Sequence, residues 1–508
     1  MNPAEQYDVV VVGSGGGALT TAYLAQKHGL RTVVLEKTDL VGGTSAYSGG
    51  ACWLPGSQVQ QRTGVPDSTE SARSYLAAVL HDPEQDKVEA FLAEAPRLVA
   101  ELEQDPALAF EFIPFPEYFP APGRVPGGRS IQPESIRRDE LPHDVAALVR
   151  PPVERDRLGE RGRRTLTGGQ ALIGRLLWAF TRESGVVRTG HCVDALVSAG
   201  GRISGVVADT PSGPRQYDAA RGVVLAAGGF EHNAAWRKEH GVPGDAAWSM
   251  APDHTNEGEP IAAGIALGAA TALLDQGWFC PGLAQPDGHG SFTLGFRSGL
   301  MVDQHGRRYA NECLPYDQFG RQMALSADRT PSWFVFDSRE GGRLPAIAIP
   351  EGDPEAHLAA GTRVRADSVQ ELAEQLSLPG LPATVARFNR FAEQGRDEDF
   401  GRGEDEYDTF FTAGQGRNAA LTPCDQPPYF AARFVLSDLG TKGGLVTDAA
   451  ARVLSPEGTP LTGLYATSNS AASLFGSSYP GPGAPLGSAM VFGSLAVRHV
   501  LANILAKD

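Results

Sequence analysis

Three tyrosines stand in segments whose composition is unusual for an ordinary core or surface position. Tyr118 lies in FPEYFP, Tyr316 in NECLPYDQFG and Tyr479 in SYPGPGAPLG. A phenol has an ordinary pKa of about 10, so it acts as a base only where its neighbours stabilise the phenolate. As a neutral group it donates a hydrogen bond to a developing oxyanion. For each tyrosine alone, the commoner role is to pack its ring and bond its hydroxyl.

The segment after Tyr479 favours a more specific interpretation. Pro480 and Pro482 have no N–H group, so Gly483 keeps one of the few backbone donors of this turn. The hydroxyl of Tyr479 and the N–H of Gly483, converging on one oxygen, would form a two-donor site for a carbonyl group. Few charged residues surround this segment, which suits an apolar ketone better than a carboxylate or a phosphate.

A second chemical motif lies near the N-terminus. Residues 13–18 read GSGGGA, between an apolar run at 7–13 that predicts a buried strand and a helix predicted at 18–28. In a G-x-G-x-x-A turn the first glycine permits the bend and the second lets the backbone approach a pyrophosphate. The small third residue allows the helix to pack on the strand, and free N–H groups at the helix start face the phosphates.

The acidic residue that such a turn requires is also present. Glu36 ends a second predicted strand at 31–36, about 20 residues after the glycine loop, where a carboxylate bonds the ribose hydroxyls. Strand, glycines, helix, strand and acid together predict a β-α-β unit that binds a dinucleotide.

The following segment favours FAD over NAD. Residues 41–50 (VGGTSAYSGG) form a second glycine- and hydroxyl-rich loop, which NAD binding does not need and which suits phosphates and an isoalloxazine. Small residues at 225–229 and 467–470 would close the same site. No CxH or HxxxxG motif near the start indicates a covalent link, so we expect non-covalent FAD. The expected contacts are Gly13, Ser14, Gly15, Gly16, Gly17, Glu36, Lys37, Gly43, Thr44, Ser45, Ser48, Gly49, Ala227, Gly228, Asn469, Pro485 and Leu486.

Composition excludes several other classes of protein. A net charge of −16 argues against a nucleic-acid binder. The five cysteines are odd in number and contain no CxxC pair, which predicts neither a disulfide framework nor a cysteine metal site and favours the cytoplasm. The histidines are scattered, so we expect no metal. The N-terminus lacks the basic region of a signal peptide, and no apolar run of about 20 residues predicts a transmembrane segment.

The length of 508 residues requires at least two domains. We predict an α/β fold, with a Rossmann-like FAD-binding domain and an inserted α+β catalytic (cap) domain. The FAD-binding domain is expected at 1–277 and 447–508, and the catalytic domain at 278–446. Further expected elements are a helix at 169–184, hairpin strands within 188–207, a strand at 222–228, helices starting at Ser368 and spanning 382–393, a strand at 463–467 and a helix at 485–502. The charged segment Asp397–Asp408 is interpreted as a solvated loop.

With these motifs in place, the chain resembles the bacterial 3-ketosteroid Δ1-dehydrogenases, within the fumarate-reductase-like flavoproteins. The segments that carry the resemblance are VVVVGSGGGALTTAY, VVLEKTDLVGGTSAYSGG, FPEY, LPYDQFGR, VLSDLGTKGGLVTD and YPGPGAPLGSAMVFG, spread over nearly the whole chain. The FAD motifs are common to many relatives, whereas LPYDQ and YPGPG are more selective.

The resemblance implies a role for each site residue. Tyr316 would remove a proton from C2 of the steroid A ring, and Tyr118 would stabilise its phenolate. Tyr479 and the N–H of Gly483 would bind the C3 ketone, while the flavin takes the hydride from C1. Two positions depart from the family pattern, Phe119 after Tyr118 and Ser468 before Asn469.

The implied partners are a 4-ene-3-ketosteroid substrate and an external electron acceptor, for which a quinone is one candidate. Steroid catabolism would be the physiological setting, and peripheral contact with a membrane stays open. The alternative activity is that of a 3-ketosteroid 4(5α)-dehydrogenase, with the same ketone site and a different C–H pair. A fumarate- or urocanate-type reductase would need cations for its substrate's carboxylates, which the tyrosine set fits poorly. A flavin-bound electron carrier is the remaining alternative.

Overall fold

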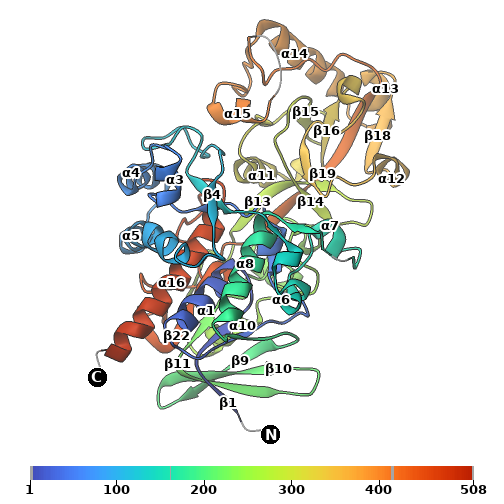
Figure 1. Cartoon of the computed structure of the whole chain (residues 1–508). Coiled ribbons are helices and arrows are strands. Elements are labelled where there is room, and N and C mark those ends of the chain that lie inside the picture. The colour runs from blue at the N-terminus through green and yellow to red at the C-terminus, as the bar shows by residue number, and fades with distance from the viewer. Residues whose placement is uncertain (1–3, 161, 413–416, 506–508) are drawn as a thin grey trace. The chain divides into compact units, whose positions relative to one another are not determined.

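The chain divides into two units, and the structure, a computed structural model, describes residues 4–160, 162–412 and 417–505 (Figure 1). Unit 1 comprises 1–241, 251–276 and 440–508, and unit 2 comprises 242–250 and 277–439. Residues 242–250 and Gly277, expected in the FAD-binding domain, therefore belong to unit 2. Residues 440–446, expected in the catalytic domain, belong to unit 1.

The β-branched run near the N-terminus forms the centre of the main sheet of unit 1. Strand β1 pairs in parallel with β11 on one side and β2 on the other, and Val9 to Val12 are all buried, as a strand covered on both faces requires. The sheet has the order β21-β22-β11-β1-β2-β8, and the antiparallel hairpin β9–β10 extends from β11.

The strands of unit 1 are β1 (Glu5–Val12), β2 (Thr32–Leu35), β3 (Cys52–Trp53), β4 (Phe110–Phe112), β5 (Ser130–Pro133), β6 (Ile136–Arg137), β7 (Thr165–Leu166), β8 (Val186–Arg188), β9 (Cys192–Ala199), β10 (Arg202–Asp209), β11 (Arg215–Leu225), β12 (Thr271–Ala272), β20 (Gly444–Leu445), β21 (Arg452–Leu454) and β22 (Pro460–Ala466).

Helices far apart in the sequence pack together in unit 1. Helix α1 lies against both α8 and α16, and α16 also packs on α5 and β3 (Figure 1). The helices of this unit are α1 (Gly16–Lys27), α2 (Gly43–Tyr47), α3 (Gln58–Arg62), α4 (Thr69–Val79), α5 (Gln85–Leu102), α6 (His143–Leu148), α7 (Val153–Asp156), α8 (Gly168–Arg182), α9 (Ala234–His240), α10 (Glu259–Ala266) and α16 (Ala484–Leu505).

One helix of the described chain is long and apolar enough to cross a membrane by length and composition alone. It spans Ala484–Ile504 within α16, and 61% of its apolar window is buried inside the protein. Because α16 packs against α1, α5 and β3, its apolar character is accounted for by packing in the core of unit 1.

Unit 2 is built on a seven-stranded sheet of order β15-β16-β19-β13-β14-β17, with β18 paired to β19. Helices α13 (Val369–Leu376) and α14 (Leu381–Gln394) bury Leu372, Leu381, Val385 and Phe388 in a core shared with Leu300 of β15 (Leu300–Val302) and other strand residues. The strands of this unit are β13 (Gly277–Ala284), β14 (Gly290–Leu294), β15 (Leu300–Val302), β16 (Ser332–Phe336), β17 (Ile347–Ile349), β18 (Arg363–Ala366) and β19 (Tyr429–Thr441). Its helices are α11 (Tyr316–Ala324), α12 (Pro354–Ala359), α13 (Val369–Leu376), α14 (Leu381–Gln394) and α15 (Glu406–Phe410).

The α/β fold with a nucleotide-binding sheet is confirmed, and most predicted elements occur within a few residues of their expected bounds. Ser368 caps α13 by accepting the N–H of Glu371 at 3.1 Å. Helices α4 and α5 were not anticipated. The N-terminus of α4 is fixed by Ser68 and Ser71, which form a reciprocal capping box, with Ser71 at the position where Glu or Gln is usual.

The interpretation of Asp397–Asp408 as a solvated loop holds for its exposed residues, such as Glu398 and Glu404, and is wrong for its buried ones. Asp397 and Arg402 are only 3% and 0% exposed, and both belong to a buried ion-pair network. Arg308 binds Asp397 at 2.9 Å and Glu312 at 2.8 Å, and Arg402 binds Glu312 at 3.0 Å. The charged composition of the segment suggested exposure, whereas the ion pairs between these side chains offset the cost of removing their charges from water.

Candidate active site

The glycine loop after β1 has the close contacts that its residue types predict. Gly13 has φ +97°, and a Cβ on it would lie 2.5 Å from the carbonyl oxygen of Ala226 at the end of β11. Gly17 approaches α16 so closely that a Cβ would lie 2.9 Å from that of Ala489. Any larger side chain at these two positions would push apart β1, β11 and α16.

The N-terminus of α1 points its free backbone donors at this loop. Its N-cap residue, Gly15, offers no side-chain cap. The N–H of Gly16 donates to the hydroxyl of Ser45 at 3.1 Å, which ties the first glycine loop to the second. A helix start without a side-chain cap, beside a glycine turn, is a site for phosphate oxygens.

Glu36 is a buried carboxylate at the end of β2. It accepts the hydroxyl of Ser14, and it accepts the N–H and hydroxyl of Thr38 at 2.8 and 2.9 Å. The hydroxyl of Ser14 in turn accepts the N–H of Gly42 at 2.9 Å. Two oxygens offer about four acceptor positions, so this carboxylate can hold both loops and still accept a ribose hydroxyl.

The neighbouring Lys37 is engaged by acidic side chains. Its Nζ donates to Glu257 at 2.5 Å and to Glu259 at 2.6 Å. Burial opposes its charge, but the hydrogen bonds and the attraction of the two carboxylates outweigh burial and raise the pKa of Lys37. The structure therefore places the side chain of this expected FAD contact on Glu257 and Glu259.

The second loop has room for a ligand along its backbone. A Cβ added at Gly43 or at Gly49 would meet no atom within 4 Å. The hydroxyl oxygen of Thr44 is buried and has no hydrogen-bond partner among the residues that the structure describes. A buried hydroxyl beside an open glycine backbone is what a bound polar group would complete. These features fit a dinucleotide cofactor.

Ser45 and Ser48 fix the shape of this loop. The hydroxyl of Ser48 donates to the carbonyl of Ser45 at 2.8 Å and accepts the N–H of Gly50 at 3.1 Å. Sequence reasoning expected a glycine- and hydroxyl-rich loop here, and within it Gly43–Tyr47 forms the short helix α2. Its start adds backbone donors next to those of α1.

The C-terminal segments close around the end of β11. The hydroxyl of Ser470 accepts the N–H of Ala227 at 3.0 Å and donates to the carbonyl of Gly228 at 2.9 Å. Leu486 lies near Gly16, where a Cβ would be 3.2 Å from its methyl group. Pro485 is in the first turn of α16. Asn469 lies near Gly440, whose Cβ would be 2.5 Å from its amide nitrogen.

Ser468, one of the two departures from the family pattern, has a backbone that explains the glycine expected there. Its φ is +59°, a left-handed conformation that glycine adopts freely and that other residues adopt at a cost of about 1–2 kcal/mol. The substitution therefore leaves the path of the chain intact before Asn469.

The segment that follows Tyr479 has its carbonyl groups occupied, whereas the N–H groups of Gly481 and Gly483 donate to no acceptor within the described chain. Gly483 has φ +83°, and its carbonyl accepts the N–H groups of Trp53 at 3.1 Å and Gly487 at 2.8 Å. Within the described chain, the N–H of Gly483 donates to no acceptor. Gly483 is a partly exposed residue, so a ligand can approach it.

Tyr118 and Tyr479 are brought together in unit 1. Both are buried, at 2% and 3% exposure, and their ring centroids are 5.2 Å apart at an interplanar angle of 65°. The N–H of Tyr118 donates to the carbonyl of Pro480 at 3.1 Å. Lys442 lies beside them, with its Nζ 5.9 Å from the ring centroid of Tyr479.

A buried ion-pair network holds the Tyr118 segment, and sequence reasoning missed it. Glu117 accepts from Arg129 at 2.7 Å and from the indole N–H of Trp53 at 2.9 Å. Arg129 also binds Asp67 at 2.7 Å, and all three charged side chains are fully buried. The acidic residue of the FPEY motif was the available signal, because a glutamate between apolar residues must be paired if it is buried.

Tyr316 lies in unit 2, as the first residue of α11. It is 6% exposed, and its ring meets that of Phe292 edge to face, with centroids 4.8 Å apart. Asp317 follows it and accepts from Arg321 at 2.9 Å across one helical turn. Gly320 lets α11 lie against β13, because a Cβ there would be 2.7 Å from the N of Cys280.

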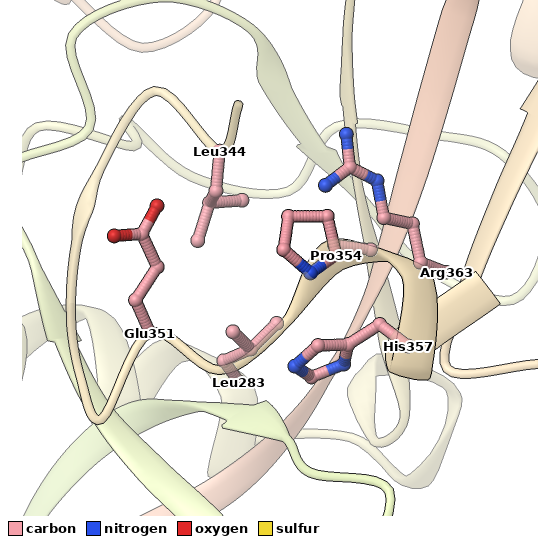
Figure 2. Close-up of a pocket in the computed structure, with 7 residues that line it drawn as sticks. Leu283, Leu344, Glu351, Pro354, His357 and Arg363 are labelled. Atoms are coloured by element: carbon pink, nitrogen blue, oxygen red, sulfur yellow. The ribbon is translucent and has the colours of Figure 1, made fainter. Parts of the chain in front are cut away.

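A small cavity of about 20 Å³ lies elsewhere in unit 2, and Figure 2 shows the residues that line it. They are Leu283, Leu344, Glu351, Pro354, His357, Arg363 and Ala432. No predicted site residue is among them, and the volume holds about one water molecule. No group of three or more His, Cys, Asp or Glu side chains that could bind a metal occurs in the described ranges.

The fold and the loops of unit 1 define an FAD-binding oxidoreductase, and the FAD binding domain family matches residues 8–486. The chain is 40% identical to a 3-oxosteroid 1-dehydrogenase of Rhodococcus opacus, over 97% of this chain and 98% of that protein. The chain belongs to the 3-oxosteroid 1-dehydrogenase family of flavoproteins.

Two further comparisons bear on the site. A crystal structure of the 3-ketosteroid delta1-dehydrogenase from Sterolibacterium denitrificans, in complex with 1,4-androstadiene-3,17-dione, has a TM-score of 0.91 and 32% identity. It covers 98% of this chain and 100% of that one. The 4-oxocyclohexanecarboxylate 2-dehydrogenase of Sinomonas cyclohexanicum is 34% identical, over 100% of this chain and 95% of that protein.

Proposed function

We propose that the protein catalyses the FAD-dependent 1,2-dehydrogenation of 3-ketosteroids. The observation that carries the proposal is the pair formed by Tyr479 and Gly483. The tyrosine is buried against Tyr118, and the glycine N–H four residues later has no acceptor within the described chain. A phenol and a backbone amide without an internal acceptor are the donors that a ketone oxygen needs.

The residues of unit 1 would hold FAD without a covalent bond. The start of α1 and the loop with Thr44 offer donors for the phosphates, and Glu36 offers an acceptor for the ribose. When bound, FAD supplies the oxidant that accepts a hydride from C1 of the substrate.

The tyrosines would stabilise the charge on the ketone oxygen and accept the proton from C2. Hydrogen bonds from Tyr479 and from the N–H of Gly483 to the C3 carbonyl stabilise the negative charge that develops on its oxygen as C2 loses a proton. Tyr316 accepts that proton, and Tyr118 stabilises its phenolate form. Loss of the proton from C2 and the hydride from C1 leaves a C1–C2 double bond conjugated with the ketone.

The side chains near the Tyr479 segment favour a neutral substrate. In unit 1, Lys442 donates to the carbonyls of Ser477 and Ser478 at 2.9 Å each, and Arg129 is paired with Glu117 and Asp67. These cations already have partners, so a substrate carboxylate gains little from them. This favours a steroid over the small oxo-acid named for the Sinomonas relative.

We also propose an external electron acceptor of the quinone class and a cytoplasmic location. An apolar substrate suits a protein that touches a membrane only peripherally. The five cysteines are free thiols, and four are buried, which fits a reducing compartment.

The test is an anaerobic titration of the holoenzyme with 4-androstene-3,17-dione, in which the visible flavin absorption is expected to bleach. Incubation with 5α-androstane-3,17-dione and an artificial acceptor then locates the new double bond by NMR. A C1–C2 double bond supports the proposal, whereas a C4–C5 double bond identifies the 4(5α)-dehydrogenase. Bleaching by 4-oxocyclohexanecarboxylate, with none by either steroid, would reject the steroid assignment.

A further inference from the structure

The loop from Ser477 to Gly483 depends on side chains from elsewhere in unit 1 to bind its carbonyl groups. Lys442 binds the carbonyls of residues 477 and 478, Tyr75 binds that of Pro480, and Ser130 binds that of Pro482 at 2.6 Å. Each of these three donors is fully buried, at 0% exposure. Because the prolines prevent regular structure, these bonds determine where Tyr479 and Gly483 lie.

Tyr75 differs from the other two donors because it contacts both tyrosine-bearing segments. Its hydroxyl donates to the carbonyl of Pro480 at 2.6 Å and accepts the N–H of Phe119 at 3.1 Å. The N–H of Tyr118 reaches the same Pro480 carbonyl at 3.1 Å. One hydroxyl on α4 therefore joins the residue after Tyr118 to the residue after Tyr479.

The ring of Tyr75 is held in place on its other sides. The centroid of its ring lies 6.5 Å from that of Trp53 and 5.8 Å from the guanidinium carbon of Arg129. Tyr75 therefore packs against two residues that Glu117 binds. Burial, and then the charge of Glu117, raise the pKa of Tyr75, so its hydroxyl stays protonated and keeps donating at any physiological pH.

We propose that Tyr75 is a positioning residue, whose hydroxyl sets the spacing between Tyr118 and the ketone-binding pair of Tyr479 and Gly483. The inference rests on the proposed function of that pair. Without the hydroxyl, the N–H of Phe119 loses its acceptor and Pro480 loses one of its two donors, so the backbone bond from Tyr118 and the ring contact with Tyr479 hold the two segments less firmly. A displacement of about 1 Å in such a site can lower turnover about 100-fold.

The test compares Tyr75→Phe with Tyr23→Phe in the full-length holoenzyme. Tyr23 is a matched control, because it is also buried in a helix of unit 1 and donates its hydroxyl to Asp105 at 2.9 Å. Both variants keep the ring; Tyr75→Phe loses the bonds to Pro480 and Phe119, and Tyr23→Phe loses the bond to Asp105. We expect kcat to fall about 10- to 100-fold in Tyr75→Phe and to stay within about two-fold in Tyr23→Phe, with FAD retained in both.

An infrared difference measurement gives a readout that a merely structural role would not change. The C3 carbonyl stretch of bound 1,4-androstadiene-3,17-dione, identified by an ¹⁸O label at C3, falls in frequency as the hydrogen bonds to it strengthen. We expect it to rise in Tyr75→Phe and to match wild type in Tyr23→Phe. Wild-type kcat and an unchanged stretch in Tyr75→Phe would overturn the inference and leave the proposed function intact.

Failure of this inference can be distinguished from failure of the proposed function. If the wild-type holoenzyme neither turns over nor binds any 3-ketosteroid, the proposed function fails and the inference fails with it. If Tyr75→Phe does not fold, 3-fluorotyrosine at position 75 keeps the ring and hydroxyl but weakens the oxygen as an acceptor for Phe119. A shifted carbonyl stretch then supports the inference, and an unshifted one rejects it.

Discussion

The rings of Tyr118 and Tyr479 meet edge to face, with their centroids 5.2 Å apart. The two segments are distant in the sequence, and the backbone bond from Tyr118 to Pro480 joins them directly. An aromatic pair of this geometry contributes about 0.5–1.5 kcal/mol beyond the area it buries, so each ring restricts the orientation of the other. The spacing of the FPEY and YPGPG motifs in space is thus fixed by unit 1 alone.

Replacing Tyr479 by Phe keeps this ring contact and removes one donor from the proposed carbonyl site. Loss of one oxyanion donor lowers kcat by about 100- to 1,000-fold in comparable enzymes, and we expect an effect of that size, measured with 4-androstene-3,17-dione. Tyr465→Phe is the control, because Tyr465 is buried in the same unit and bonds His499 at 2.9 Å. Equal kcat in the two variants would mean that the Tyr479 hydroxyl does not touch the ketone.

Replacing Tyr316 by Phe tests the proton acceptor. General-base catalysis contributes about 100- to 10,000-fold, so kcat should fall within that range while the flavin spectrum stays that of wild type. Tyr309→Phe is matched to it in unit 2, since Tyr309 is buried and bonds Ser332 at 2.9 Å. Activity of Tyr316→Phe within a few-fold of wild type would assign the base to another residue.

The sequence allowed the nucleotide-binding core of unit 1 to be predicted because its signals are local. A β-branched run, a glycine turn and a terminal acid each act within a few residues, and Gly13 has the positive φ that its place in the motif implies. The helix α4 was missed because its capping box uses Ser71 in place of an acid, and because its buried face consists of only four residues, Ala72, Tyr75, Leu76 and Val79.

The predicted site was incomplete for a different reason. Tyr118, Tyr479 and Gly483 were found from motifs, but the side chains that hold them are distant in the sequence. Tyr75 and Arg129 carry no local signal, since a tyrosine in a helix and an arginine after a glycine turn suit many surfaces. Their roles follow only from burial and from partners such as Pro480 and Glu117.

The buried ion-pair network of Arg308, Glu312 and Arg402 predicts that the stability of the protein depends on pH. Burial alone would raise the pKa of Glu312, but Arg308 and Arg402 outweigh it and hold that pKa below its ordinary value. A carboxyl whose pKa is lower in the folded state stabilises the protein above its unfolded pKa, and this stabilisation is lost as pH falls through the folded pKa. The affected window lies below about pH 4.5.

Glu312→Gln removes this titration while keeping an acceptor for the N–H of Met301, which Glu312 binds at 3.1 Å. Unpairing a buried arginine costs about 3–5 kcal/mol, so we expect the variant to be less stable than wild type by that amount at pH 7. In urea unfolding, the difference should shrink below about pH 4.5. The exposed Glu374→Gln serves as the control, and a difference that is constant with pH would contradict the prediction.

Thr44 offers a direct test of the cofactor loop, because its buried hydroxyl has no partner within the described chain. A hydroxyl that bonds FAD contributes about 1–1.5 kcal/mol to binding, so Thr44→Val should weaken FAD binding by about 10-fold. The stability of the apoprotein should be unchanged or higher, because the substitution removes a polar atom that only the cofactor satisfies.

Thr20→Val is the matched control for Thr44→Val. Thr20 is buried in α1, and its hydroxyl also has no partner among the described residues. It lies one helical turn beyond the glycine loop and is not an expected cofactor contact. Both substitutions remove the same atom from a buried site, so a difference between them in FAD dissociation constant, measured by fluorescence on reconstitution of the apoprotein, reports contact with the cofactor. Equal affinities in the two variants would mean that the Thr44 hydroxyl bonds no part of FAD.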